Sequence, residues 1–530
     1  MREFDRPGRS PVYAENGMAA TSHPLATAAA IAVLKEGGNA VDAAIAASAV
    51  LTVVEPHMTG IGGDCFVILA EPDGSVHGLN GSGRAPAGAS AARLREMGHA
   101  RMPDSGPHSV TVPGAVKAWE TLHQRFGRLD FARLFDEAIA YAEDGYALHP
   151  RVAADWSDQA AKLAADEGAG RHYLVDGKAP AVGSRHRVPA FAATLRRIAR
   201  DGAKVLYEGE IAAEIAATVR AKGGFLTEED LAAASADWVE LISTPYAGHD
   251  VLEIPPNGQG ITALILLNLM RKIGTGLLDP ASADRYHLEI EAARLAYSVR
   301  DHMVADPAMM RVSPETLLSE AYTDALAAHI DPMRRNPEIV LPKLPGANTI
   351  YLTVVDRERR AVSFINSVYS SFGAKIVTPN SCIALQNRGA CFSLEEGHPN
   401  ELGSAKRPMH TIIPAMAMKN GKPVVSFGVM GGAYQPMGHA HVFSNLADHG
   451  MDPQQALDHA RLFWDDDDGT VLEAEAGISD EIRSELTRKG HALRSAAKPH
   501  GGGQAIVIDE KNGFLVAGSD HRKDGLALGW

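Results

Sequence analysis

The stretch that decides the fold is "TIYLTVVDRERRAVSFINSVYSSFG", residues 349–373, which follows the segment "NPEIVLPKLPGAN" at 336–348. The preceding segment holds three prolines and a glycine, a composition typical of a linker. The runs 349–355 and 361–369 are rich in β-branched and aromatic residues, which favour strands. Strands this apolar are typical of sheets covered on both faces. The first predicted strand therefore begins at Thr349, directly after a linker.

Helical patterns dominate the chain before this stretch, and strand signals increase after it. Residues 23–38 predict a helix with Pro24 in its first turn, and Asn39 is placed to cap a second helix at 40–54. Further strands are predicted at 381–387, within 412–429 and within 504–518. The last two segments contain the turn signals "KNGK" and "EKNG", which are typical of hairpins.

The composition is that of an ordinary globular protein, with 45% hydrophobic and 22% charged residues among 530. A formal net charge of −14 argues against a nucleic-acid partner. The three cysteines, Cys65, Cys382 and Cys391, match no zinc spacing, and their odd number argues against a disulfide framework. The N-terminus lacks the apolar segment of a secretory signal, and the most apolar run, 40–54, is too short to span a membrane. We expect a soluble, cytoplasmic protein without a membrane partner.

Several common catalytic motifs are absent from the sequence. There is no G-x-S-x-G elbow, no P-loop and no H-E-x-x-H motif. The acidic run at 464–475 resembles a calcium loop, but aligning Gly469 with its invariant glycine places Trp464 at the first ligand position. His439 and His441 are two residues apart in a predicted helix and therefore point to different faces. We expect neither a metal nor a cofactor.

Thr349 has two interpretations. A threonine is at home in a strand, and this is the ordinary reading of such a residue. Thr349 also follows a linker, and cleavage of the Asn348–Thr349 bond would give it a free α-amine. Such an amine has a pKa of about 7.7–8.0 and can act as the base that a threonine hydroxyl needs in order to become a nucleophile.

The stretch at 349–373 resembles the start of the small subunit of γ-glutamyltranspeptidases, which are N-terminal-nucleophile hydrolases. "KRPMHTIIPAM" and "FGVMGGAYQP", which follow it, resemble further segments of that family. Matching landmarks precede it in the expected order: "GGNAVDAAIAAS", "EPHMTGIGGDCF", "SVTVPGAV" and "GGFLTEEDL". The resemblance extends from about Gly17 to the C-terminus. It implies an α/β fold, a four-layer αββα sandwich, and a precursor that cleaves itself into a large subunit, 1–348, and a small subunit, 349–530. The two subunits would form one compact unit, and such heterodimers could pair into a dimer.

The resemblance also implies roles for individual residues. Thr349 would attack the carbonyl of Asn348 to release its own amine, and would then attack the substrate amide to form an acyl-enzyme. Gly431 and Gly432 would donate backbone N–H groups to the oxyanion, a role that suits glycine because the ligand can approach its backbone closely. Ser367 occupies the position of a hydroxyl residue near the nucleophile.

The substrate pocket departs from the family pattern. Cys391 stands where transpeptidases carry an acidic residue for the substrate α-ammonium, and Tyr369 replaces an asparagine near the nucleophile. His410 and Thr411 replace a Ser-Ser pair. Arg84 lies two residues beyond the expected carboxylate-binding arginine, at a position where bidentate pairing is still conceivable. Arg388 is a second candidate cation, with a surface arginine as the alternative reading.

These features lead to three functional hypotheses. The first is hydrolysis of γ-glutamyl amides such as glutathione, with hydrolysis favoured over transfer. The second is an amidase for carboxylate-bearing amides that lack an α-amine, as in glutaryl-cephalosporin acylases and oxamate amidohydrolases. The third is an unprocessed relative without catalytic activity. The partner in the first two is a small amide substrate that carries a carboxylate.

Overall fold

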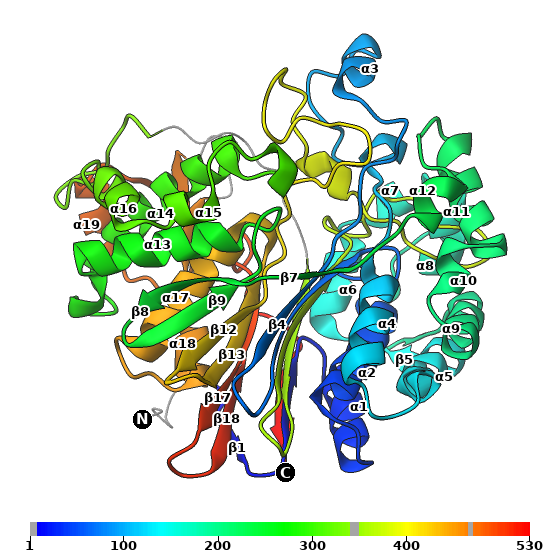
Figure 1. Cartoon of the computed structure of the whole chain (residues 1–530), viewed down its shortest axis with the longest axis horizontal. Coiled ribbons are helices and arrows are strands. Elements are labelled where there is room, and N and C mark those ends of the chain that lie inside the picture. The colour runs from blue at the N-terminus through cyan, green and yellow to red at the C-terminus, as the bar shows by residue number, and fades with distance from the viewer. Residues whose placement is uncertain (1–7, 340–348, 465–469) are drawn as a thin grey trace.

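Two seven-stranded sheets pack face to face between two layers of helices, as Figure 1 shows. The computed structural model describes residues 8–339, 349–464 and 470–530. The first sheet has the order β1 (Val12–Ala14), β18 (Phe514–Ser519), β17 (Gly502–Asp509), β13 (Lys422–Met430), β12 (Ala415–Lys419), β9 (His249–Glu253) and β8 (Ile242–Tyr246). The second has the order β19 (Leu526–Gly529), β2 (Met18–Thr21), β10 (Ile350–Val355), β11 (Ala361–Ser367), β3 (Asp64–Ala70), β4 (Val76–Gly81) and β7 (Asp237–Val239). The expected αββα sandwich is confirmed.

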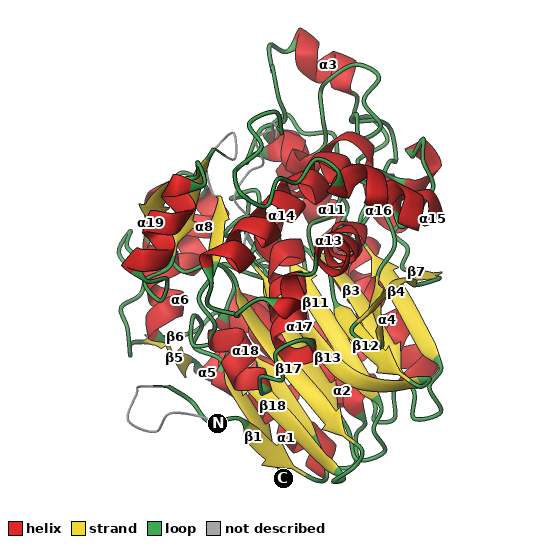
Figure 2. Ribbon diagram, turned by 90° about the vertical axis from the view of Figure 1, so that its left-hand side faces the viewer, coloured by secondary structure: helices red, strands yellow, loops and turns green. Residues whose placement is uncertain are grey.

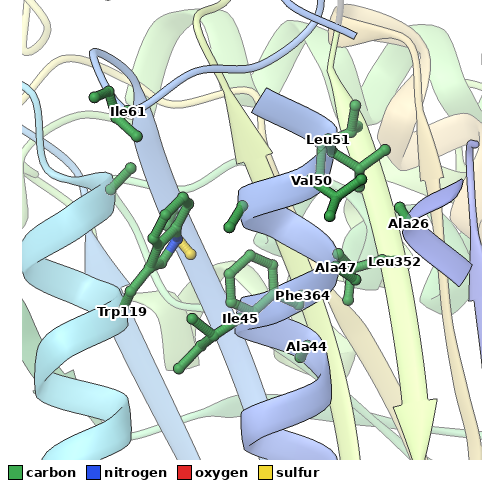
Figure 3. Packing of buried hydrophobic residues seen from close by; sticks show 14 of the residues in the cluster. Ala26, Ala44, Ile45, Ala47, Val50, Leu51, Ile61, Trp119, Leu352 and Phe364 are labelled. Atoms are coloured by element: carbon green, nitrogen blue, oxygen red, sulfur yellow. The ribbon is translucent and has the colours of Figure 1, made fainter. Parts of the chain in front are cut away.

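Strands β10 and β11 lie in the middle of the second sheet. Every residue of both strands is buried, because one face packs on the first sheet and the other on helix α2 (Ala40–Val54). Figure 3 shows Ala47 and Leu51 of α2 close to Leu352 and Phe364. Burial of each such large apolar side chain contributes about 1.5–3 kcal/mol. The apolar runs at 349–355 and 361–369 are therefore central strands, as the sequence predicted.

Helices cover the outer face of each sheet. Beside the second sheet lie α1 (Pro24–Lys35), α2 and α4 (Ala115–Phe126); beside the first lie α13 (Gly260–Ile273), α14 (Ala283–Met303), α17 (Gln435–Ala447) and α18 (Pro453–Asp458). Asn39 caps α2, as expected, in a reciprocal capping box with Asp42. The apolar character of α1 and α2 on nearly all sides follows from their burial between the sheet and other helices.

The remaining elements surround the sandwich, and Figure 2 shows several of them in a second view. The helices are α3 (Ala91–Glu96), α5 (Asp136–Asp144), α6 (Pro150–Ser157), α7 (Ala160–Leu163), α8 (Glu167–Tyr173), α9 (Pro189–Asp201), α10 (Lys204–Tyr207), α11 (Glu210–Ala221), α12 (Glu228–Ala232), α15 (Pro314–Leu317), α16 (Glu320–Ala327) and α19 (Asp480–Arg488). The short strands are β5 (Tyr146–Ala147), β6 (Arg185–His186), β14 (Leu462–Trp464), β15 (Val471–Ala474) and β16 (Ala492–Ser495). None of the described helices combines the length and the apolar character needed to cross a bilayer.

The predicted hairpins are present, but one predicted strand is wrong. β12 pairs with β13 through a turn in which Asn420 and Gly421 both have positive φ, and β17 pairs with β18. Residues 381–387 form no strand. Cys382 has a φ of +54°, and the backbone bonds of this segment go to several different partners, including Gly62 and Val368. The segment is apolar because it is buried, not because it belongs to a ladder.

The sequence on either side of Thr349 contributes to the same sheets. β10 pairs with β2 from the first part of the chain, and β11 pairs with β3. In the other sheet, β12 pairs with β9. The two parts of the chain therefore share one hydrophobic core.

Candidate functional site

Thr349 and Ser367 lie side by side where β10 begins and β11 ends. The antiparallel register pairs Ile350 with Asn366, which brings the two flanking hydroxyl residues together. The Thr349 Oγ1 and Ser367 Oγ atoms are 3.1 Å apart, within hydrogen-bond distance. Both residues are fully buried. Because central strands hold both residues, the hydroxyl pair is fixed by the sheet and not by a loop.

Arg388 approaches this pair from the short 3-10 turn Arg388–Cys391. Its Nη2 donates to Ser367 Oγ at 3.3 Å and its Nη1 to Thr411 Oγ1 at 2.6 Å. The residue is completely buried, so it is not the surface arginine of the alternative reading. In the described parts of the chain, no carboxylate lies within ion-pair distance of it, and its Nε has no hydrogen-bond partner. The site therefore contains a buried positive charge for which residues 8–339, 349–464 and 470–530 supply no counter-ion.

Tyr369 and Cys391 form the wall beside Arg388. The guanidinium lies 4.4 Å from the centre of the Tyr369 ring, a cation–π distance. Tyr369 has a φ of +77°, and its backbone N–H donates to Ser367 Oγ at 2.8 Å. Burial raises the pKa of the Tyr369 phenol, the Cys391 thiol adds to this effect, and Arg388 opposes it. Cys391 is buried with Tyr369 and Ala390 in a small cluster.

His410 is held by protein groups at both ring nitrogens. Its Nε2 lies 3.0 Å from Asp64 Oδ2, and its Nδ1 accepts from the Ile412 N–H. Burial lowers the pKa of His410 to about 4, the charge of Arg388 adds to this, and Asp64 opposes it. The imidazole is therefore neutral at pH 7, with Nε2 donating to Asp64. The ring braces the segment that carries Thr411 and has no nitrogen left to offer a substrate.

Gly431 and Gly432 form the turn between β13 and α17. Their φ angles are +123° and +57°, a region that favours glycine. A Cβ on Gly431 would lie 2.8 Å from the Cα of Gly501, so the turn has no room for a side chain there. Because the turn leads into the N-terminus of a 13-residue helix, its N–H groups lie at the positive end of the helix dipole. A glycine turn at such a position is one that can present backbone N–H groups to an anion.

Arg84 belongs to a different part of the surface. Its Nη1 donates to the carbonyl of Ala405 at 3.2 Å and lies 3.8 Å from Asp306, and its side chain is 42% exposed. It lines a pocket of about 710 Å³ together with Arg311 and Lys406. None of its hydrogen bonds or ion pairs reaches the group around Ser367. Asn348 lies outside the described residues.

Other positions singled out in the sequence have structural partners. His439 Nδ1 lies 2.8 Å from Glu253, and His441 Nδ1 lies 2.9 Å from Glu289, so the two rings face different groups. Across residues 8–339, 349–464 and 470–530, no three side chains are arranged to hold a metal ion. Residues 465–469 of the acidic run are not described.

Sequence reasoning missed Gln259, which contacts two parts of the site. Its amide nitrogen donates to the carbonyls of Thr411 and Gly432. The glycines that flank it in "PNGQG" predict a tight loop before α13, and this motif was the only available signal. The structure shows that the glutamine is buried. The two carbonyls lie 152 and 173 residues further along the chain, so no local pattern predicts these contacts.

The comparisons with known proteins agree with this architecture. The family model described as Gamma-glutamyltranspeptidase matches residues 26–530. The chain is similar to the glutathione hydrolase-like YwrD proenzyme of Bacillus subtilis, with 35% identity over 97% of this chain and 98% of the relative. It is also similar to the oxamate amidohydrolase proenzyme of Klebsiella pneumoniae, with 34% identity over 97% and 98%.

A solved structure gives the same result. The crystal structure of the cephalosporin acylase from Bacillus halodurans has a TM-score of 0.93 and 40% identity, and the match covers 100% of this chain and 99% of that chain. The chain therefore belongs to the γ-glutamyltranspeptidase family. The three proteins compared above are named as glutathione hydrolase-like, as an oxamate amidohydrolase and as a cephalosporin acylase.

Proposed function

We propose that this protein is a self-cleaving amidase for amides whose acyl group carries a distal carboxylate and no α-amine. The observation that carries the proposal is Arg388, a fully buried guanidinium that has no counter-ion among the described residues and lies one hydrogen bond away from the hydroxyl pair of Thr349 and Ser367. A substrate carboxylate would supply the missing charge.

The energetics of the buried charge support this assignment. Removing an ion from water costs on the order of several kcal/mol unless a partner compensates it. The hydroxyls of Ser367 and Thr411 accept hydrogen bonds from the guanidinium, and the Tyr369 ring lies against it. None of these groups carries a negative charge that would neutralise it. A carboxylate pairs with arginine through charge-assisted, often bidentate, hydrogen bonds. Binding such a substrate would thus relieve a cost that the free protein bears.

The same surroundings disfavour a substrate ammonium. Tyr369 and Cys391 offer a ring and a thiol where an α-amine would need a carboxylate, and Arg388 would repel a second positive charge. This feature favours glutaryl-like or oxamate-like acyl groups over γ-glutamyl groups. The acyl pocket would be lined by Tyr369, Cys391 and Thr411. His410 would hold the segment that carries Thr411 in place. Arg84, which lies beside Ala405 and Asp306, would contact the amine part of the substrate.

The proposed reaction uses Thr349 as the nucleophile. Its Oγ attacks the amide carbonyl, its α-amine accepts the hydroxyl proton, and Gly431 and Gly432 donate N–H groups to the oxyanion. The amine then returns the proton to the leaving nitrogen as the C–N bond breaks, which leaves an ester on Thr349. Water hydrolyses this ester to the free acid. Ser367 would keep the Thr349 hydroxyl oriented through their 3.1 Å contact.

The α-amine would arise from cleavage before Thr349. The Thr349 hydroxyl would attack the carbonyl of Asn348, and hydrolysis of the resulting ester would give a large subunit, 1–348, and a small subunit, 349–530. Two relatives are named as proenzymes, which supports this maturation. The two products would stay together because β10 and β11 pair with β2 and β3 of the large subunit.

Hydrolysis of γ-glutamyl amides such as glutathione is the second candidate. It is favoured by the similarity to the YwrD protein, which is described as glutathione hydrolase-like. In that case we expect hydrolysis to exceed transfer, because Cys391 stands where transpeptidases carry the acidic residue that binds the α-ammonium.

A matched pair of variants tests the proposal. Thr349→Val removes the hydroxyl, while Thr353→Val makes the same change four residues further along the same buried segment, where the hydroxyl contacts Ser426. On a denaturing gel, we expect the wild type and Thr353→Val to split into two bands and Thr349→Val to remain a single chain. Anilides with glutaryl, oxamyl and γ-glutamyl groups then rank the substrates. Cleavage of Thr349→Val, or a wild type that stays uncleaved and inactive, would refute the proposal.

A further inference from the structure

The side-chain amide of Gln259 bridges two segments of the site. Its Nε2 donates to the carbonyl of Thr411 at 2.6 Å and to the carbonyl of Gly432 at 2.9 Å. Thr411 holds Arg388 through its hydroxyl, and Gly432 belongs to the turn of positive φ that precedes α17. Both hydrogens of one primary amide are therefore used to tie the Arg388 side of the site to the glycine turn.

Helix α14 fixes the orientation of this amide. Arg300 Nη1 donates to Gln259 Oε1 at 2.9 Å, which determines which end of the amide carries the N–H groups. Arg300 is itself held by Asp301 at 2.7 Å and lies over the Tyr297 ring at 4.3 Å. The Tyr297 hydroxyl donates to the carbonyl of Ala433, the next residue of the same turn. Gln259 and Arg300 are buried to 99% or more.

We propose that Gln259 is a positioning residue for the oxyanion turn, held in register by Arg300 and Tyr297 of α14. By binding the carbonyls of Gly432 and Ala433, this clamp fixes the two peptide planes that directly follow the glycines, and so restrains the turn that carries the N–H groups of Gly431 and Gly432. A single amide also couples the turn to Thr411, so the carboxylate and oxyanion ends of the substrate are held at a fixed separation.

The clamp has a second consequence after cleavage. Gln259, Arg300 and Tyr297 belong to the part of the chain before Thr349, whereas Thr411 and the glycine turn follow it. The large subunit would therefore set the geometry of the oxyanion turn in the small subunit. This inference rests on the proposed function for its catalytic part, but the contacts themselves can be tested independently.

The test compares three substitutions. Gln259→Met has a similar volume and removes both donors and the acceptor. Gln259→Glu keeps an acceptor for Arg300, whose charge keeps the carboxylate ionised, but presents negative oxygens to two carbonyls. Gln454→Met is the matched control, because Gln454 is equally buried and bonds the backbone of Ser519 through both ends of its amide, outside the contacts of this site.

Hydrogen–deuterium exchange and steady-state kinetics provide two separate readouts. We expect peptides spanning residues 430–434 to exchange faster in both Gln259 variants than in the wild type or Gln454→Met. We expect kcat to fall by about 10–10²-fold in both, with little change in KM, because misplaced donors weaken the transition state more than the bound substrate.

Each outcome decides one question. Unchanged exchange at 430–434, or an unchanged kcat in Gln259→Met, would overturn the clamp. Recovery of kcat in Gln259→Glu would also overturn it, since the glutamine would then serve only to hold Arg300. A wild type with neither self-cleavage nor amidase activity would refute the proposed function, and in that case the exchange experiment alone decides whether the clamp holds the turn.

Discussion

Buried arginines in two regions of this protein differ in their partners. Arg522 bonds Glu475 through two nitrogens, at 2.8 and 2.5 Å, and Asp520 at 3.1 Å. Arg461 bonds Asp520 at 2.6 Å. Although burial alone would raise the pKa of Glu475, Arg522 lowers it to about 2. Arg388 is just as buried, yet its partners are two hydroxyls and a ring.

The difference separates structural charges from functional ones. In the group of Arg461 and Arg522, every charge is matched within the protein, and the group ties the loop after β18 to the segment between α18 and β14. At Arg388, the part of the chain that the structure describes supplies no counter-charge. We infer that the first group serves the fold and that the second serves a ligand.

The largest effect is expected on stability, from a substitution in the group of Arg461, Arg522, Glu475 and Asp520. Arg522→Met should lower the free energy of unfolding by about 3–5 kcal/mol, because it leaves Glu475 buried without its charged partner and Asp520 with Arg461 alone. Urea titration measures this loss, and the kcat/KM of the protein that remains folded should be unchanged. A variant as stable as the wild type would break the comparison.

Arg388→Met is the same substitution at the unmatched site, and it should produce the opposite pattern. We expect kcat/KM for a glutaryl anilide to fall by about 10²-fold, roughly 2.7 kcal/mol, because a charged hydrogen-bond partner of the carboxylate is lost. Stability in urea should stay the same or increase, since an uncompensated buried charge is removed. A large loss of stability with full activity would assign Arg388 to the fold.

Thr411→Val should have a smaller effect. It removes the hydroxyl that accepts from Arg388 Nη1 and keeps the shape of the side chain. A kcat/KM reduction of about tenfold, near 1.4 kcal/mol, is expected from one lost hydrogen bond to a charged group. Steady-state kinetics on the glutaryl anilide measures it. A reduction as large as that of Arg388→Met would mean that Thr411 contacts the substrate directly.

The smallest expected difference is the change that Arg388→Met makes to the pH dependence of stability. The pKa of His410 is about 4 in the folded protein and about 6.5 when unfolded, so the unfolded chain binds the extra proton first as pH falls. His410 therefore costs stability progressively from pH 6.5 to 4, by about 3 kcal/mol in total. Arg388→Met should raise the pKa of His410 and reduce this loss, as urea titrations at several pH values would reveal. Identical pH dependence in both proteins would show that the two groups do not interact.

The sequence predicted the central strands because their apolar runs are long and uninterrupted. The capping of α2 by Asn39 and the hairpin turn at Asn420 and Gly421 were equally readable, since each depends on neighbouring residues. The strand predicted at 381–387 failed because burial by several unrelated segments produces the same apolar composition as a sheet does.

The site was less predictable because its contacts are long-range. The resemblance to a family directed attention to Thr349 and Ser367, but no local pattern predicts their contact. His410 is paired with Asp64, 346 residues away, so its role as a brace could not be read from the chain. Likewise, Arg388 could be a surface residue in the sequence and is a buried one in the fold.

The most direct test of the central claim compares two substrates that differ only in charge. Glutaryl p-nitroanilide carries the distal carboxylate, and its 4-carbamoylbutanoyl counterpart replaces this carboxylate with a neutral amide of the same shape. We predict that the wild type prefers the carboxylate by about 10²-fold in kcat/KM, as expected for one charged contact, and that Arg388→Met loses this preference. Equal kcat/KM values for the two substrates in the wild type would contradict the account.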